Sequence, residues 1–351
     1  MKGILISSTE PYSGKSAIVV GLTLALRKRG YDVGFMKPVG NLITDVDGVL
    51  CDEDTLKIID ALRIREPHEH VCPILLTDSL LVDVLSGQSK RIKEKIREAY
   101  DRLKKGRDVM LVEGLGDFGG GAMMGLSDID MAKLLDLRIL LIVKYGSVYA
   151  VDSLLKDISF IKDRRTLVGV ILNDVKPARM NEVKTKVKPF LERRGLRVLG
   201  ILPRDDILRS IKVSDIVEQL HGKVLAGEDY LDNLVRNIVV GAMEPHNALR
   251  FFRRVDDKIV VSGGDRSVVL TAALETSTKC LLLTGNLKPT AQLLARAEER
   301  HVPVILVPDD TASTVYRLGE MHSRIRVSGS RKVSRMKSMV EKNVDLKAIL
   351  R

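Results

Sequence analysis

The chain has 351 residues, with 57 Lys and Arg against 46 Asp and Glu and a formal net charge of +11 at pH 7. This length predicts two domains and is ample for real apolar cores. No apolar run reaches the length of a membrane span, and the N-terminus lacks the pattern of a signal peptide. The three cysteines form no CxxC pair, which supports neither a zinc site nor a disulfide framework and favours a reducing, cytoplasmic setting.

Part of the positive charge is concentrated after Ser328, whereas elsewhere basic residues alternate with acids, as in KRIKEKIREAYDRLKKGR. Tryptophan is absent and aromatic residues make up 4% of the chain, so a surface for stacking nucleic-acid bases is not expected. We therefore predict a solvated basic surface and a small acidic metabolite as a ligand, with neither nucleic acid nor membrane as a partner.

Short apolar runs alternate with helix-like periodicity along the first half of the chain. Most of these runs are continuously apolar, as in strands that helices cover on both faces. The βαβ order predicts an α/β fold with a doubly wound parallel sheet. The expected strands are GILISS, VGFMKPV, VMLVEGL, RILLIVK, LVGVILNDV and RVLGILP, and the expected helices include residues 15–29, 79–105, 148–162 and 179–194.

The first series closes near Pro203, and a second α/β series follows it. Its expected strands lie in VRNIVVGAM, DKIVVSG, KCLLLTG and VPVILVP, each trailed by a helix-like stretch. These patterns predict a larger α/β domain over residues 1–210, a second, smaller α/β domain over residues 211–325, and a basic C-terminal tail over residues 326–351 that is one helix or disordered.

The segment SSTEPYSGKSA, residues 7–17, joins the first expected strand to the first expected helix. Its Gly14-Lys15-Ser16 ending is typical of a phosphate-binding loop, although a chance GKS in a strand-helix turn is the alternative. Backbone N–H groups at the helix start bind an anion, Lys15 reaches the β- and γ-phosphates, and Ser16 offers a hydroxyl to magnesium. The predicted nucleotide-binding residues of this loop are Thr9, Glu10, Ser13, Gly14, Lys15 and Ser16.

Charged residues stand at the ends of two further strands, where ligands of parallel α/β sheets gather. Lys37 in GFMKPVG is a ligand for phosphate or carboxylate, or else an exposed strand-end charge. Glu113 in VMLVEGLGDFGGG suits magnesium, with a plain turn as the alternative. The stretch DVDGVLCDEDTLKI contains helix caps and one possible second metal ligand, and spacing does not choose among Asp45, Asp47, Asp52 and Asp54.

Taken together, these residues resemble those of dethiobiotin synthetase and its relatives among the P-loop enzymes that activate amides and carboxylates. The resemblance covers residues 1–205 in the right order and spacing. The matching features are the loop from Ser8 to Ser16, Lys37 in KPVG, Glu113 in VEG, Asp130 in DMAKLL, and Asn173-Asp174 in GVILNDV.

This resemblance implies a P-loop NTPase-type fold that binds ATP and Mg²⁺. It implies Lys37 and Lys15 as the catalytic residues, the first at the reacting carboxylate or phosphate and the second on the phosphates. It also implies that Asn173 reads the edge of the adenine base. The implied metal ligands are Ser16, Asp54 and Glu113.

Several residues depart from the family pattern. Tyr12 stands where the family has an acid, and Pro11 stiffens the loop and removes a backbone donor. These changes spare the groups that hold nucleotide more than those that hold substrate, so we expect nucleotide binding rather than biotin synthesis. The substituted positions are Ser8, Pro11, Tyr12, Asn41, Leu115 and Asp117.

The second half resembles a DRTGG domain, through VSGGDRSVVLTAAL, CLLLTGNLKP and VPVILVPDDTAST. A P-loop domain followed by a DRTGG domain is similar to the N-terminal portion of long phosphotransacetylases, in which an acetyl-transferring domain follows. Because this sequence ends at Arg351, we expect the regulatory half without that transferase. Asp265 and Arg266 are either an effector site at a helix start or a structural salt bridge.

Two functions fit these observations. The first is a Mg-ATP-binding regulatory or scaffolding protein that uses its DRTGG domain for self-association or effector sensing. The alternative is an ATP-dependent ligase or synthetase that activates a carboxylate or carbamate, or a weak ATPase. In either case we expect a homodimer or a higher homo-oligomer, since symmetric dimers are the commonest assembly.

Overall fold

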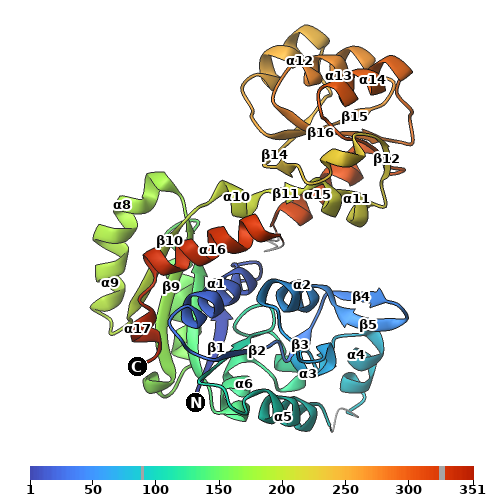
Figure 1. The fold of residues 1–351 in the computed structure, drawn as a ribbon. Coiled ribbons are helices and arrows are strands. Elements are labelled where there is room, and N and C mark those ends of the chain that lie inside the picture. Colours follow the sequence, from blue (N-terminus) through green and yellow to red (C-terminus); the bar gives the residue numbers. More distant parts are fainter. Residues whose placement is uncertain (88–90, 324–328) are drawn as a thin grey trace. The chain divides into compact units, whose positions relative to one another are not determined.

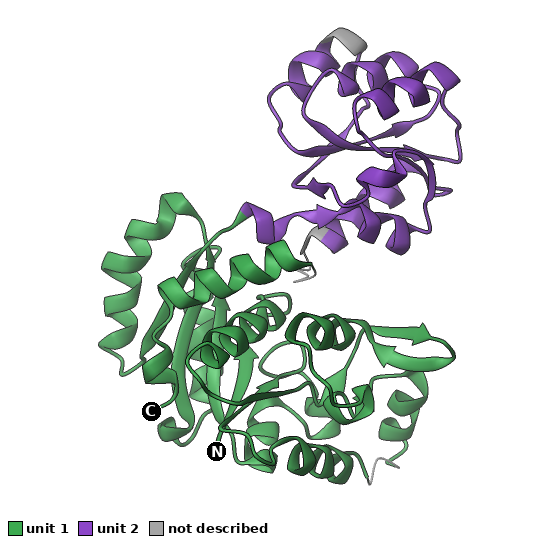
Figure 2. Ribbon diagram, in the orientation of Figure 1, with its two compact units in different colours: residues 1–205, 326–351 green, residues 206–325 purple. Residues whose placement is uncertain are grey.

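The computed structural model describes residues 1–87, 91–323 and 329–351. The chain divides into two compact units, which we call unit 1 (residues 1–205 and 326–351) and unit 2 (residues 206–325; Figure 2). Unit 1 therefore contains both the beginning and the end of the chain. No helix in the described ranges is long and apolar enough to cross a membrane.

A six-stranded sheet in the order β10-β9-β8-β1-β7-β2 forms the centre of unit 1, and every neighbouring pair in it is parallel (Figure 1). The order reverses at β1, so the loop after β1 lies at the switch point where α/β sheets bind ligands. The sheet confirms the predicted α/β fold and all six predicted strands. They are β1 (Lys2–Ser8), β2 (Val33–Met36), β7 (Val109–Glu113), β8 (Arg138–Lys144), β9 (Leu167–Val175) and β10 (Val198–Pro203).

Two small sheets that the sequence did not predict lie beyond β2. They are the parallel pair β3 (Val39–Gly40) and β6 (Ile74–Leu75), and the hairpin of β4 (Ile43–Val46) and β5 (Val49–Asp52). The strands β3, β4 and β5 carry the chain from Lys37, just after β2, to the helix α2 (Glu53–Leu62), and β6 follows later in the chain.

The helices of unit 1 follow the predicted alternation with one correction. The single helix predicted over residues 79–105 is wrong, because α4 ends at Leu85 and α5 begins at Ile92, with residues 88–90 outside the described range. Gly87 has a φ of 73°, the left-handed conformation in which glycine commonly ends a helix. Besides α2, the α-helices that precede β10 are α1 (Lys15–Arg27), α3 (His68–Val71), α4 (Asp78–Leu85), α5 (Ile92–Leu103), α6 (Asp128–Leu135), α7 (Tyr149–Ser159), α8 (Met180–Glu182) and α9 (Lys188–Glu192).

The C-terminal segment forms α16 (Ser330–Asn343) and α17 (Leu346–Ile349), and α16 lies beside α1 (Figure 1). A Cβ atom at Gly21 of α1 would stand 2.7 Å from Val340 Cγ2 and 3.1 Å from Met336 Cγ. The missing side chain therefore lets the two helices approach closely. The described residues of the segment that the sequence set apart as a tail are thus packed into unit 1.

Unit 2 contains a five-stranded sheet in the order β12-β17-β16-β15-β14, parallel except for the β12-β17 pair. Alternate residues of β16 enter two separate apolar clusters, Leu281 and Leu283 in one and Cys280 and Leu282 in the other. The sheet is therefore buried on both faces, within the second α/β domain that the sequence predicted. Its elements are α10 (Asp206–Arg209), β11 (Ile211–Lys212), α11 (Val213–Leu220), β12 (Lys223–Ala226), β13 (Leu234–Val235), β14 (Asn237–Val240), α12 (Pro245–Phe252), β15 (Lys258–Gly263), α13 (Ser267–Leu274), β16 (Thr278–Thr284), α14 (Ala291–Glu299), β17 (Val304–Leu306) and α15 (Thr311–Ser323).

Candidate functional site

The loop between β1 and α1 is anchored from the end of β9. Gly14 directly precedes α1 with a φ of 93°, a conformation that side chains disfavour. Asn173 Nδ2 donates a hydrogen bond of 2.8 Å to the Ser13 carbonyl oxygen, and a Cβ at Gly14 would stand 2.6 Å from that same nitrogen. The structure thus places Asn173 against the loop backbone, and its predicted contact with adenine stays a prediction.

The first part of the loop is only partly available to a ligand. The backbone N–H of Thr9 donates to the Ile142 carbonyl oxygen of β8 at 3.3 Å, and the Glu10 carbonyl accepts from Ser8 Oγ at 2.8 Å. The side chain of Ser13 is buried, and its hydroxyl has no hydrogen-bond partner among the described residues. Tyr12 has a φ of 54° and is 45% exposed, so its ring lies on the surface of the loop.

Lys15 is buried, and its ammonium is held by uncharged groups. Its Nζ atom donates to Ser8 Oγ at 2.9 Å and to the carbonyl oxygen of Gly116, in the loop after β7. Burial lowers the pKa of Lys15, although the carboxylates of Glu113 and Asp128 oppose that shift. An ammonium that has only neutral partners gains an ion pair when a phosphate oxygen replaces one of them.

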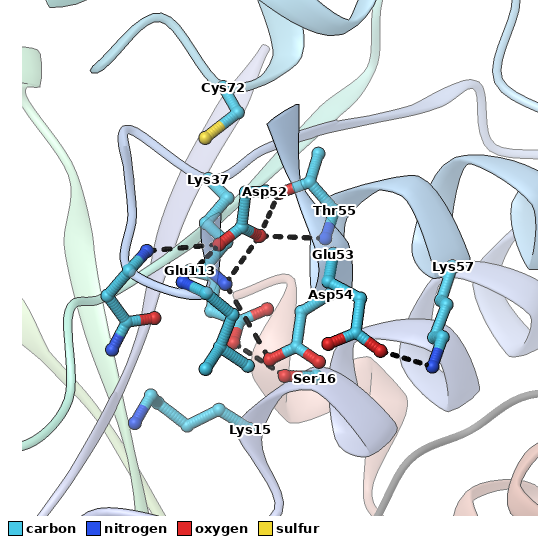
Figure 3. A network of polar contacts seen from close by, with 12 residues as sticks. Lys15, Ser16, Lys37, Asp52, Glu53, Asp54, Thr55, Lys57, Cys72 and Glu113 are labelled. Carbon is cyan, nitrogen blue, oxygen red and sulfur yellow. Dashed lines mark hydrogen bonds and ion pairs between the residues drawn. The ribbon is translucent and has the colours of Figure 1, made fainter. Parts of the chain in front are cut away.

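Ser16 and Glu113 meet beside Lys15 (Figure 3). The Ser16 hydroxyl donates to Glu113 Oε1 at 2.7 Å, while the buried Oε2 has no hydrogen-bond partner within the described part of the chain. Burial raises the pKa of Glu113, and the ammonium groups of Lys37 and Lys15 act against that rise. An unpartnered carboxylate oxygen next to a hydroxyl fits a magnesium ion, which takes few protein ligands and completes its shell with phosphate and water.

No group of three His, Cys, Asp or Glu side chains that could hold a metal ion occurs in residues 1–87, 91–323 and 329–351. A metal at Glu113 and Ser16 would therefore depend on the bound phosphate for part of its coordination.

Lys37 lies at the end of β2 in an acidic enclosure (Figure 3). Its side chain is 4% exposed, and its Nζ atom is 2.8 Å from Asp52 Oδ1 and 3.7 Å from Asp54 Oδ2. Burial acts to lower the pKa of Lys37, but the carboxylates of Glu113, Asp52 and Asp54 together raise it. Lys37 is therefore a fixed charge that three acids share, and of its two sequence alternatives the exposed strand-end charge is wrong.

Asp52 is the centre of that enclosure. It accepts backbone N–H groups from Asn41 and Leu42 at 3.0 Å each, and both the N–H and the hydroxyl of Thr55, at 2.8 and 2.7 Å. Burial acts to raise the pKa of Asp52, but Lys37 and these hydrogen bonds hold it below its usual value. Asp52 is thus both the N-cap of α2 and the partner of Lys37.

The acidic stretch that the sequence could not resolve divides in two. Asp52 and Asp54 lie at Lys37, whereas Asp45 lies in β4 and Asp47 in the turn between β4 and β5. Asp45 Oδ1 accepts the backbone N–H of Gly48 at 2.8 Å, which is the usual role of an aspartate in a turn.

Asp128 is a buried acid that sequence reasoning missed. It accepts a hydrogen bond from the Ser7 hydroxyl at the end of β1, and Gly114 has no side chain where the carboxylate lies. Burial is the main cause that raises the pKa of Asp128 to about 7. Asp130, which the resemblance singled out, lies in the first turn of α6, where its Oδ2 atom accepts a hydrogen bond of 2.5 Å from the Ser127 hydroxyl. No sequence signal separates two acids that open the same helix.

Comparisons with known proteins bear on this site. Residues 2–212, which carry the whole phosphate-loop region, match the AAA domain family. The chain belongs to this AAA domain family. Residues 215–321 of the same chain match the DRTGG domain.

The chain is similar to two kinds of named protein. It is 26% identical to the phosphate acetyltransferase of Synechocystis sp., over 99% of this chain and 51% of that protein, and 26% identical to the one of Nitratidesulfovibrio vulgaris, over 97% and 50%. It is 28% identical to the ATP-dependent dethiobiotin synthetase BioD of Bacillus cereus, over 63% of this chain and 93% of that protein. The chain spans about half the length of the phosphate acetyltransferases. These matches confirm the predicted resemblance to both families.

Proposed function

We propose that this protein binds Mg-ATP at the phosphate loop of its AAA domain and acts as a regulatory or scaffolding protein. Lys15 and the backbone at Gly14 would hold the phosphates, and Ser16 and Glu113 would hold the metal, which neutralises phosphate charge when it is bound. Support comes from the neutral partners of Lys15 and from the unpartnered Oε2 of Glu113.

The observation that carries the regulatory part of the proposal is the pairing of Lys37 with Asp52. In a synthetase, the Lys37 ammonium would have to point at the transferred phosphoryl group, on which negative charge develops. Here that ammonium is 2.8 Å from a carboxylate that four other hydrogen bonds fix in place. Pulling Lys37 away would leave a buried carboxylate without its counter-charge, which is strongly unfavourable.

Isothermal titration of the protein with ATP and magnesium tests nucleotide binding. We expect binding that the Lys15→Ala variant loses by at least tenfold, because a charge-assisted contact to phosphate disappears. Lys28→Ala is the matched control, since Lys28 follows α1 and its side chain is 62% exposed. If the folded protein bound no nucleotide, the proposal would be wrong.

The second candidate is an ATP-dependent synthetase that phosphorylates a small carboxylate or carbamate. One observation favours it: the Lys37 ammonium feels the charge of Glu113 as well as those of Asp52 and Asp54, so it belongs to the same charge cluster as the predicted metal ligands. ADP release that requires an added carboxylate, and that Lys37→Ala abolishes, would establish this activity. ATP binding without such turnover across a panel of acidic metabolites would favour regulation.

A further inference from the structure

A cavity of about 460 Å³ adjoins the phosphate loop without including Lys15, Ser16 or Lys37. Thr9 forms its border with the loop, and the remaining walls come from residues 117–119 after β7, from the N-terminal turn of α6, and from α7. Its volume falls within the range of small-molecule sites, which is about 300–1,000 Å³.

Asp157 of α7 is the buried charge in this wall. It is 5% exposed, its Oδ1 atom is 3.3 Å from Lys156 Nζ, and its Oδ2 atom has no hydrogen-bond partner among the described residues. Buried polar atoms are almost always paired, so an unpaired carboxylate oxygen in a cavity wall indicates a missing donor. The ionised carboxylate accepts hydrogen bonds only, so the donor would come from the ligand.

The surroundings of Asp157 select a cation with an apolar body. A second carboxylate, Asp117, lines the same cavity, as do the apolar side chains of Phe118, Ile129 and Phe160. Lys156 also lines it, and its ammonium is already paired with Asp157 Oδ1. The N-terminus of α6 would by itself attract an anion. Its first turn already carries two aspartates, Asp128 and Asp130, which offset that attraction.

We propose that the cavity between α6 and α7 binds a primary ammonium compound with an apolar or aromatic body, whose ammonium donates to Asp157 Oδ2. The aromatic rings supply apolar contact, and a ring face also attracts a cation. This site goes beyond the nucleotide site, because Lys15, Ser16 and Glu113, which are proposed to hold phosphate and metal, do not line the cavity. Thr9 at its border is the one lining residue that the sequence predicted to contact nucleotide.

Phenethylamine, which is a cation at pH 7, is the probe, with the uncharged phenethyl alcohol and the anionic hydrocinnamate as isosteric controls. Titration by calorimetry should show the amine binding at least tenfold more tightly than either control. Asp157→Asn should weaken amine binding at least tenfold through the loss of one charge-assisted hydrogen bond. Asp152→Asn changes an exposed acid of the same helix and should leave the affinity unchanged.

Three outcomes would overturn the proposal: no binding of the amine, equal binding of the alcohol or the carboxylate, or full amine affinity in a folded Asp157→Asn variant. Should that variant fail to fold, the comparison of the three probes on the natural protein decides alone. Lys15→Ala separates this site from the proposed function, since it should lose ATP binding and keep amine binding.

Discussion

The two buried lysines of the AAA domain differ in what surrounds their ammonium groups. Lys15 in the phosphate loop contacts a hydroxyl and a carbonyl oxygen, and burial lowers its pKa. Lys37 at the end of β2 contacts two carboxylates; burial opposes ionisation there too, yet the acids raise its pKa. Burial is common to both, so the charge of the partners decides which ammonium an incoming anion can take.

This difference assigns separate tasks to the two regions. A phosphate that reaches Lys15 displaces neutral oxygens and adds an ion pair. A ligand that takes Lys37 from Asp52 must leave that carboxylate buried without its counter-charge. The phosphate loop is therefore suited to exchange ligands, whereas the end of β2 is suited to hold the start of α2 in place.

Removing Asp52 should have the largest effect on the free energy of unfolding, because it breaks the ion pair that holds Lys37. Asp52→Ala removes the nearest counter-charge of the buried Lys37 and leaves it only Asp54 and Glu113, which should cost about 3 kcal/mol of the free energy of unfolding. It also removes the N-cap of α2, which adds about 1 kcal/mol. Urea unfolding followed by circular dichroism measures the change.

Asp54→Ala is the control for that variant. Asp54 is 26% exposed in its side chain and 3.7 Å from Lys37, so the change should stay within about 1 kcal/mol. Equal destabilisation by the two variants would show that Lys37 does not depend on Asp52, which would contradict the proposed regulatory role.

The features of the site that depend on local sequence could be predicted. A run of apolar residues followed by Gly14-Lys15-Ser16 predicts a strand, a phosphate loop and a helix within one short segment. The choice of Asp52 over Asp45 and Asp47 depends on the β4–β5 hairpin, which turns the chain so that only the later acids return to Lys37. That path of the chain is set by tertiary packing, so the spacing of the acids in the sequence does not predict it.

Asp128, which lies near Lys15, should make the free energy of unfolding depend on pH. Its pKa, raised to about 7 chiefly by burial, exceeds the value of about 3.9 in the unfolded chain, so between these values the folded state binds more protons. Stability contributed by this group is therefore present at low pH and is lost as the pH rises toward 7. Between pH 5 and pH 7 the loss should be about 2 kcal/mol.

The Asp128→Asn variant isolates this contribution. The free energy of unfolding of the natural protein and of the variant should be measured at several pH values from 5 to 7. Relative to the natural protein, the variant should become more stable by about 2 kcal/mol as the pH rises over this range. Parallel pH curves for the two proteins would show that Asp128 is already ionised in the folded protein.

Gly14 offers the smallest and most local test, on the phosphate-loop side. Gly14 and Gly30 have similar φ angles of 93° and 88°, so alanine costs about 1–2 kcal/mol of backbone strain at either position. Only at Gly14 would the new Cβ meet another group, Asn173 Nδ2 at 2.6 Å, whereas nothing lies within 4 Å at Gly30. Gly14→Ala should therefore destabilise by about 1 kcal/mol more than Gly30→Ala in urea unfolding. Adding Asn173→Ala should remove that excess if the amide causes it, and should deepen the loss if Asn173 mainly anchors the loop through Ser13.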